Sequence, residues 1–216
     1  MNRRRTMVAA LILALGGASA CSPSTSESSG TPEHADPPAS SAQATPELTA
    51  ALGQARGATA KYVTDLSAAE ADGYQIITKM MPGMGYHYLN SAVEGFDVTA
   101  PPILVYVKDG DRWLLGALEW VWPEEPASPP LDGATYGSFD AACHFKDGTF
   151  VAAAAEAECG RTNPDGGSPF TFWHPKLVTM HVWLWHHNPA GLYHPTNPLV
   201  KTSTSRPSKY DRWGEG

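Results

Sequence analysis

The stretch KLVTMHVWLWHHNPAGLYHPTN, from Lys176 to Asn197, contains four of the eight histidines and indicates how the chain folds. Its first half alternates as expected of a β-strand, which we place at 176–185. On that strand, His181 lies on the face opposite to Met180 and Val182. Burying a histidine ring without a partner costs about 1–3 kcal/mol, so His181 predicts a polar partner from elsewhere in the chain.

Two further polar residues stand inside otherwise apolar segments. His87 occurs in GYHYLN (85–90), and Glu119 is the only charge in WLLGALEWVW (113–122). If the three segments are adjacent strands in register, cross-strand side chains lie about 5 Å apart, so all three residues can meet. Two histidines and one carboxylate form the ligand set of a divalent-metal site with open positions, suited to Zn, Fe or Cu. We therefore predict that His87, Glu119 and His181 are metal ligands.

The same residues allow other interpretations. Glu119 could accept a hydrogen bond from His181 or His87 in a buried pair without metal, or it could face water at a sheet edge. The neighbouring methionines Met80, Met81 and Met84 would suit Cu(I), but methionine also fills apolar cores.

Three other histidines follow the predicted strand. His187 would lie about 20 Å from His181 if the strand is straight, so the two cannot bind one ion. His186, His187 and His194 are therefore candidates for a second, looser site or for a polar rim.

Aromatic residues support an alternative function, the binding of a small ligand. They could form the walls of a pocket for an apolar or sugar-like molecule, with His and Glu as its polar contacts. Core packing would explain the same residues, which are Trp113, Trp120, Trp122, Trp173, Trp183, Trp185, Tyr86 and Tyr88.

The first residues have the pattern of an export signal. Three arginines precede an apolar run from Met7 to Leu15, and small residues lead to Cys21. Ala18-Ser19-Ala20-Cys21 resembles a bacterial lipobox, which implies a signal peptide at 1–20 and a lipid on Cys21 at the outer face of the cell membrane. Ordinary secretion, with cleavage after Ala20 and a free Cys21, is the alternative. The Ser/Pro/Thr-rich segment up to residue 45 predicts a disordered tether.

Charge and length limit the remaining chain. Without residues 1–20 it carries 12 basic and 22 acidic residues, a formal net charge of −10. Nucleic acid is therefore excluded as a partner, and cations are favoured. We expect one globular domain at 46–200, followed by a polar tail at 201–216. Cys143 and Cys159 predict a disulfide in an exported protein, although Cys143 beside His144 could also serve as a thiolate metal ligand.

Local patterns predict an α+β fold. Thr45-Pro46-Glu47 begins a helix that ends near residue 64, and a capping box at 67–70 opens a second, short helix. Strands are expected at 74–79 and 85–90, as a hairpin at 103–107 and 113–122, and as a pair at 141–145 and 149–153. We predict two N-terminal helices packed on a mainly antiparallel sheet of five or six strands, with 176–185 at its centre.

Known catalytic motifs do not help to assign a reaction, because the chain has no HExxH, no CxxC and no Gly-rich phosphate loop after a strand. PGMGYHYLN (82–90), FKDGTFV (145–151) and FWHPKLVTMHVWLWHHNPAGLYHPTNPLV (172–200) resemble segments of a family of uncharacterised exported bacterial proteins. That resemblance implies a single domain of shared fold and no particular activity.

Overall fold

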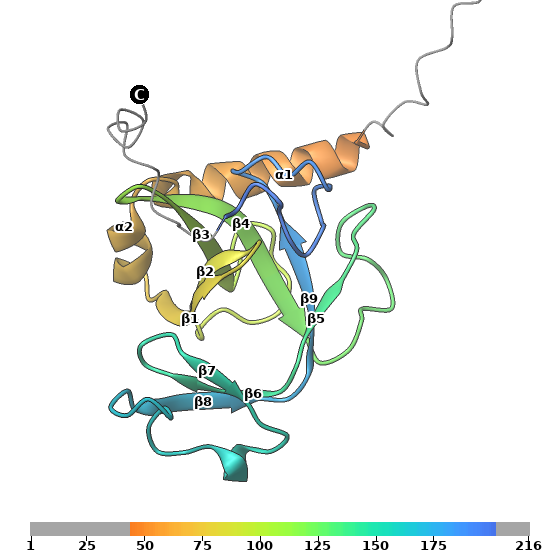
Figure 1. Cartoon of the computed structure of the whole chain (residues 1–216). Helices are drawn as coiled ribbons and strands as arrows, with labels where there is room; N and C mark the ends of the chain where they lie inside the picture. Colours follow the sequence, from red (N-terminus) through yellow and green to blue (C-terminus); the bar gives the residue numbers. More distant parts are fainter. Residues whose placement is uncertain (1–43, 202–216) are drawn as a thin grey trace, which may run out of the picture. The chain divides into compact units, whose positions relative to one another are not determined.

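Six antiparallel strands form the sheet that carries the three predicted ligands (Figure 1). The computed structural model describes residues 44–201, which belong to one compact unit. The strand order is β1-β2-β3-β4-β9-β5. Their bounds are β1 Gln75–Met81, β2 Gly85–Leu89, β3 Ile103–Asp109, β4 Arg112–Trp122, β5 Gly137–Phe139 and β9 Leu177–Val182. The predicted signal peptide at 1–20, Cys21, most of the predicted tether and the tail beyond Lys201 lie outside the described residues.

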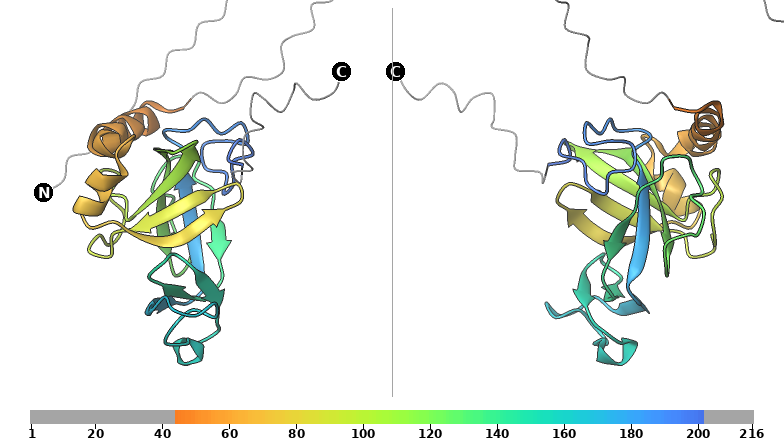
Figure 2. Two further views of the ribbon diagram at one scale, coloured as in Figure 1. Left: turned by 60° about the vertical axis from the view of Figure 1, so that its left-hand side comes forward. Right: turned by 90° about the vertical axis from the view of Figure 1, so that its right-hand side faces the viewer.

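One face of this sheet packs against the N-terminal helix, α1 (Pro46–Thr59). The side chain of Thr45 caps α1 by accepting a hydrogen bond from the backbone N–H of Leu48, as predicted. The buried residues Leu48 and Ala55 of α1 join Leu104 and Leu118 of the sheet in the largest core cluster. Figure 2 shows α1 on one side of the sheet in both views. Because side chains alternate along a strand, the neighbours of these core residues face the other side.

The prediction of two N-terminal helices is only partly correct. After α1 the chain forms a short 3-10 helix, η1 (Ala60–Tyr62), and then α2 (Leu66–Ala71), which has only six residues. Asp65, and not Ser67, caps α2, because its carboxylate accepts a hydrogen bond from the backbone N–H of Ala68. Within residues 44–201, α1 is therefore the only helix of more than two turns that packs on the sheet.

A second, three-stranded sheet was not predicted. It consists of β6 (Ala142–Phe145), β7 (Phe150–Ala152) and β8 (Phe170–His174), in the order β7-β6-β8. The predicted pairing of β6 with β7 is confirmed. β8 and β9 are nearly continuous in sequence, but Pro175 lies between them and cannot donate a ladder hydrogen bond. The chain therefore leaves one sheet at His174 and enters the other at Leu177.

The strand predicted at 176–185 is shorter and less central than expected. β9 ends at Val182 and lies next to the edge strand β5. Beyond Val182 the backbone leaves the strand. The N–H of Trp183 donates to the carbonyl of Leu192, and the N–H of Trp185 donates to the carbonyl of Gly116. His186 and His187 therefore follow a turn and are not part of the sheet.

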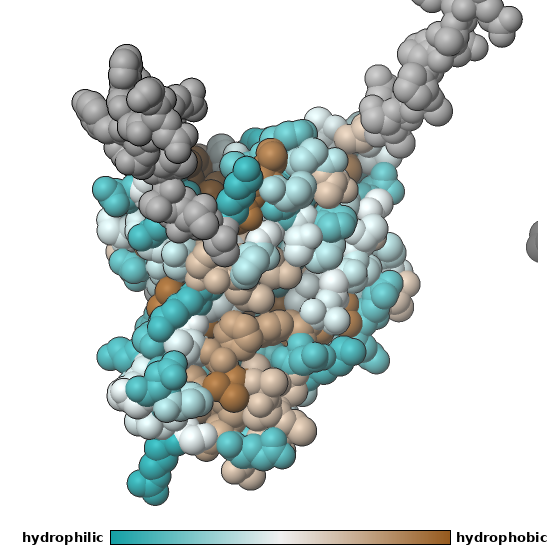
Figure 3. Space-filling view, viewed as in Figure 1, coloured by the Kyte–Doolittle hydropathy of each residue, from teal (hydrophilic) through white to brown (hydrophobic). Residues whose placement is uncertain are grey.

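The second sheet is tied down by covalent and polar contacts. The predicted disulfide between Cys143 and Cys159 is present, so Cys143 is not a free thiolate. A short 3-10 helix, η2 (Glu156–Glu158), precedes Cys159. The N–H of Lys79 in β1 donates to the carbonyl of Gly148, next to β7. Figure 3 shows apolar surface, coloured brown and tan, gathered where the two sheets adjoin. Within the described range, no helix is both long and apolar enough to cross a bilayer.

Candidate metal centre

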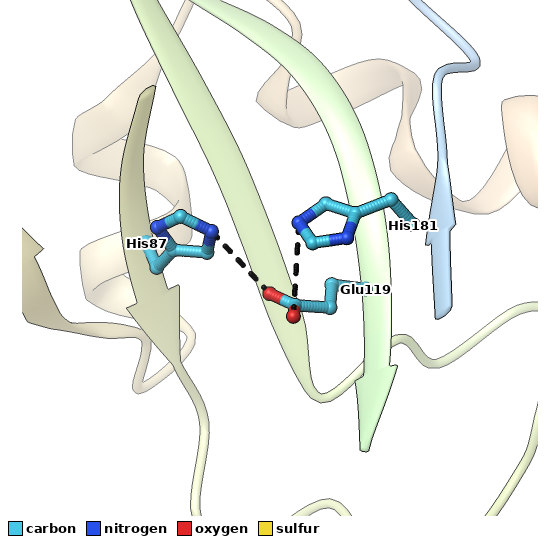
Figure 4. A group of neighbouring side chains, drawn as sticks. All are labelled: His87, Glu119 and His181. Carbon is cyan, nitrogen blue, oxygen red and sulfur yellow. Dashed lines mark ion pairs between the residues drawn. The ribbon is translucent and has the colours of Figure 1, made fainter. Parts of the chain in front are cut away.

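Three buried polar side chains converge on the sheet face that lies opposite to α1. They are His87 of β2, Glu119 of β4 and His181 of β9 (Figure 4). One ligand atom from each lies within 4.8 Å of those of the other two. Their exposed fractions are only 4%, 5% and 2%, so the three side chains are almost completely removed from bulk solvent. The side chains predicted to meet do so, and they could hold a metal ion.

Strand register explains part of this convergence. Glu119 lies directly opposite His181 in the β4–β9 pair. The contact of His87 with Glu119 does not follow from strand pairing, because β3 lies between β2 and β4. His87 pairs with Val105 of β3, and Val105 pairs with Ala117 of β4. The His87 side chain therefore reaches Glu119 across the curled face of the sheet and not along one row of cross-strand neighbours (Figure 4).

The distances in this triad exceed those of good hydrogen bonds. His87 Nε2 lies 3.5 Å from Glu119 Oε2, and His181 Nε2 lies 3.7 Å from Glu119 Oε1. An N–H···O hydrogen bond normally spans about 2.7–3.2 Å. Two ligands held about 2.1 Å from a tetrahedral metal ion are separated by about 3.4 Å. Both nitrogen–oxygen distances are therefore closer to this ligand–ligand separation than to the usual hydrogen-bond length.

His181 is the residue whose polar atoms are least satisfied. Both ring nitrogens are buried, and neither has a hydrogen-bond partner in the described structure. Its ring stacks near Trp183, with ring centroids 6.2 Å apart and an interplanar angle of 14°. At least one nitrogen of a neutral ring is a donor, and leaving such a group unpaired costs about 1–3 kcal/mol. A cation at Nε2 would remove part of that cost.

His87 is held from behind by Thr78 in β1. Its Nδ1 lies 2.6 Å from Thr78 Oγ1, which also accepts a hydrogen bond from the backbone N–H of His87. If Nδ1–H donates to this hydroxyl, the lone pair of Nε2 points at Glu119. Metal-binding histidines commonly have such a partner at the other nitrogen, because it selects the tautomer and the ring orientation.

Replacing Thr78 with valine should weaken metal binding about 10–100-fold, the usual effect of losing a residue that orients a ligand. Thr78→Ser keeps the hydroxyl and should bind nearly as tightly as the wild type. Isothermal titration with Zn²⁺ measures both affinities. Equal weakening in the serine and valine variants would mean that the hydroxyl does not orient His87.

Burial controls the protonation of the triad. It raises the pKa of Glu119 to about 8 and lowers the pKa of His181 to about 4. The pKa of His87 is lowered to about 3, first by burial and then by His181 and His144 nearby. At neutral pH and without metal, Glu119 is therefore protonated and both rings are neutral. Neutral imidazole is the form that binds metal, and metal binding would release the proton of Glu119.

The triad lines a cavity of about 220 Å³ between the two sheets. Most of the wall is apolar and includes Ile77, Val121, Phe139, Phe172 and Leu177. Because the three ligands come from one wall, a metal bound there would have its remaining positions directed toward the cavity. Such an arrangement would let a small molecule in the cavity reach the ion.

The methionines near His87 separate in the structure. Met81 and Met84 line the cavity together with the triad. Met80 packs instead against a smaller core cluster around Val105 and Val107. Two thioethers therefore share the cavity with the predicted ligands.

The other histidines predicted as site residues lie outside this centre. Among the described residues, the triad is the only group of three or more His, Cys, Asp or Glu side chains with metal-site spacing, so His186, His187 and His194 form no second group. His187 and His194 are exposed. The proposed aromatic walls do not line the cavity either; Trp120, Trp183 and Tyr88, for example, are buried in the core.

Sequence reasoning missed Thr78 and the aromatic wall of the cavity. Thr78 lies in the predicted strand at 74–79, but a threonine in a strand has no signal that distinguishes a ligand partner from an ordinary packed residue. Phe139 and Phe172 belong to β5 and β8, neither of which was predicted as a strand.

Together, the fold and the centre describe an α+β protein with a buried His–Glu–His group that could hold a metal ion. Comparisons of the chain with protein-family models, with curated proteins and with solved structures found no match. We therefore infer function from the geometry of the centre.

Proposed function

We propose that this protein binds a divalent metal ion through His87 Nε2, the carboxylate of Glu119 and His181 Nε2. The observation that carries the proposal is the state of His181, whose two ring nitrogens are buried without a partner and whose Nε2 lies 3.7 Å from Glu119. A hydrogen-bonded pair without metal would be expected to close to a shorter distance. A metal ion would accept the lone pairs of both rings and neutralise the ionised carboxylate.

The ligand set suits Zn²⁺, Fe²⁺ or Cu²⁺. Met81 and Met84 in the same cavity would favour copper if their sulfurs also bind. Three protein ligands leave at least one position for water or for another molecule, as in catalytic and sensing sites. This openness distinguishes the centre from a closed structural site.

A small ligand is the natural second occupant of the cavity. Apart from its histidines, the remaining cavity lining is largely apolar and includes the aromatic rings of Phe139 and Phe172. We infer that a small, largely apolar molecule with one oxygen or nitrogen donor would bind with that donor on the metal and its body against the two phenylalanines. The alternative function, binding of a small ligand, is therefore retained. The aromatic residues proposed to contact that ligand are now Phe139 and Phe172 and not the tryptophans.

Metal analysis of protein purified without a His tag tests the first part of the proposal. His181→Gln should lose one bound equivalent of Zn²⁺ or Co²⁺ relative to the wild type, as measured by equilibrium dialysis and elemental analysis. His187→Gln is the matched control, because His187 is exposed and outside the triad. If His181→Gln folds and retains all of the metal, the triad is not a metal site.

We also propose that the protein is exported and anchored in the membrane by a lipid on Cys21. Support comes from the basic, apolar and small-residue pattern that ends at Cys21, together with the Ser/Pro/Thr-rich composition of the segment that follows it. Expressed in a bacterial host, the wild type should incorporate labelled palmitate and partition into the membrane fraction. Cys21→Ser should do neither. A mature protein that begins at Cys21 with a free thiol would instead indicate ordinary secretion.

A further inference from the structure

A second pair of histidines lies on the opposite wall of the cavity. His144 belongs to β6 and His174 to β8, and both line the cavity with the triad. In the β6–β8 pair, His174 faces Ala142 and His144 faces Phe172, so the two histidines are diagonal neighbours on one face. Their Nε2 atoms are 3.0 Å apart.

Hydrogen bonds at the other ring nitrogens determine what these two Nε2 atoms can do. His144 Nδ1 lies 2.8 Å from the carbonyl oxygen of Ile77, and His174 Nδ1 lies 2.6 Å from the carbonyl oxygen of Pro175. A carbonyl oxygen only accepts, so each Nδ1 must carry the hydrogen. In a neutral ring, Nε2 is then an acceptor with an exposed lone pair. Two such lone pairs repel when their nitrogens are 3.0 Å apart, unless one cation binds both.

Packing prevents the two rings from separating easily. The His144 ring is 1% exposed and stacks on Phe172, with ring centroids 4.6 Å apart and an interplanar angle of 5°. His174 stacks on Phe139 at 5.3 Å and 29°. Aromatic contacts on both rings therefore hold the two Nε2 atoms together, although neither is satisfied by the other in the neutral state.

The cation that fits this geometry is a metal ion. Two imidazole nitrogens at about 2.0–2.1 Å from an ion, with an angle of 90–109° between them, are separated by about 2.8–3.4 Å. The observed 3.0 Å falls in this range. An Nδ1–H that donates to a backbone carbonyl is also the usual support of a metal-binding histidine. Both features are present at both residues.

We propose that His144 Nε2 and His174 Nε2 bind a second divalent metal ion, of a kind that prefers imidazole, such as Zn²⁺ or Cu²⁺. Its other positions are open to the cavity and are filled by water or by the donor atoms of a ligand. The site is separate from His87, Glu119 and His181, and the proposal does not depend on whether those residues bind metal. A ligand in the cavity would meet one ion on each wall.

Metal stoichiometry in four variants of the mature chain tests the proposal and separates it from the first centre. The wild type should bind two equivalents of Zn²⁺, His174→Gln one, His181→Gln one, and the double variant none. His194→Gln is the matched control and should bind two, because His194 Nδ1 also bonds to a backbone carbonyl, that of Thr196, but His194 does not line the cavity. Near-ultraviolet circular dichroism confirms the fold of each variant.

Three outcomes decide between the proposals. If His174→Gln binds as much Zn²⁺ as the wild type, the histidine pair is not a metal site, whatever the triad does. If metal is lost in His174→Gln but not in His181→Gln, the pair is a metal site and the triad is not. Nitrogen-15 NMR adds a readout on the wild type alone, because Zn²⁺ should shift the Nε2 resonances of His144 and His174. The competing arrangement is one proton shared between the two Nε2 atoms, which NMR detects as coupling across an Nε2–H···Nε2 hydrogen bond. If this coupling is present and does not change at saturating Zn²⁺, the proposal is overturned.

Discussion

Replacing Glu119 with glutamine is expected to weaken metal binding at the triad by more than about 100-fold while leaving the protein folded. Glu119 would supply the only negative charge among the three ligands, and it lies between the two rings (Figure 4). Losing a residue that merely orients a ligand typically costs 10–100-fold, so losing a charged ligand should cost more. Glutamine has nearly the same volume and is neutral, like the protonated carboxyl of the metal-free protein, so no cavity or unpaired charge is created.

The measurement is a competition titration with a chelator, which reports affinity over several orders of magnitude. Glu124→Gln is the matched control, because it removes the same charge from an exposed position five residues along the chain. The control should bind like the wild type. Unchanged affinity in Glu119→Gln, with a normal unfolding curve, would falsify the assignment of Glu119 as a ligand.

The metal-free wild type is expected to lose stability as the pH rises from about 6 to about 9. Burial raises the pKa of Glu119 from 4.5 to about 8, so the folded state keeps a proton that the unfolded state has already released. Stabilisation of this kind is fully present below pH 4.5 and is lost as the pH rises through the folded value. The difference between the unfolded pKa of 4.5 and the folded pKa of about 8 corresponds to at most about 5 kcal/mol in the free energy of unfolding.

At acidic pH, the two histidines change the stability in the opposite direction, because their protonation favours the unfolded state. Burial lowers the pKa of His181 to about 4, and burial together with His181 and His144 lowers that of His87 to about 3. The unfolded chain therefore binds more protons below pH 6.5, and stability is lost as the pH falls from there through about 4 and 3. The three residues together place the greatest stability of the metal-free protein at about pH 6.5.

Urea unfolding in the presence of a chelator, repeated across this pH range, measures the effect. Glu119→Gln has no carboxyl at this position, so its loss of stability between pH 6 and 9 should be smaller by about 2–3 kcal/mol. With saturating Zn²⁺ the wild type should show the reverse trend up to about pH 8, because metal binds to the ionised carboxylate and displaces its proton. Parallel pH profiles for the two metal-free proteins would mean that Glu119 is ionised in the folded state.

Local chemistry in the sequence was sufficient to select the three triad residues. His87, Glu119 and His181 were singled out because each interrupts an apolar strand, and a polar group that is buried needs a partner. The helix cap at Thr45, the hairpin of β3 and β4 and the disulfide followed from equally local signals. Such signals can be read because caps, turns and alternation involve residues only a few positions apart.

The histidine pair shows where this reasoning stops. His144 drew attention only as the neighbour of Cys143, and His174 lies in a segment that was not predicted as a strand. Nothing near either residue in the chain indicates that their Nε2 atoms lie 3.0 Å apart, since 30 positions separate them. The acceptor of the His144 Nδ1–H is the backbone carbonyl of Ile77, and every residue has such a carbonyl.

The strands other than β5 and β8, the buried polar residues and the Cys143–Cys159 bond could thus be predicted from the sequence alone, because alternation, turn chemistry and cysteine pairing depend on residue type. The division into two sheets, the position of β9 near an edge and the contact of His87 with Glu119 across β3 could not. They depend on where Pro175 interrupts the ladder and on how far the large sheet curls. Curl is the sum of small twists over many residues, and it brings the side chains to one point without any signal in their own segments.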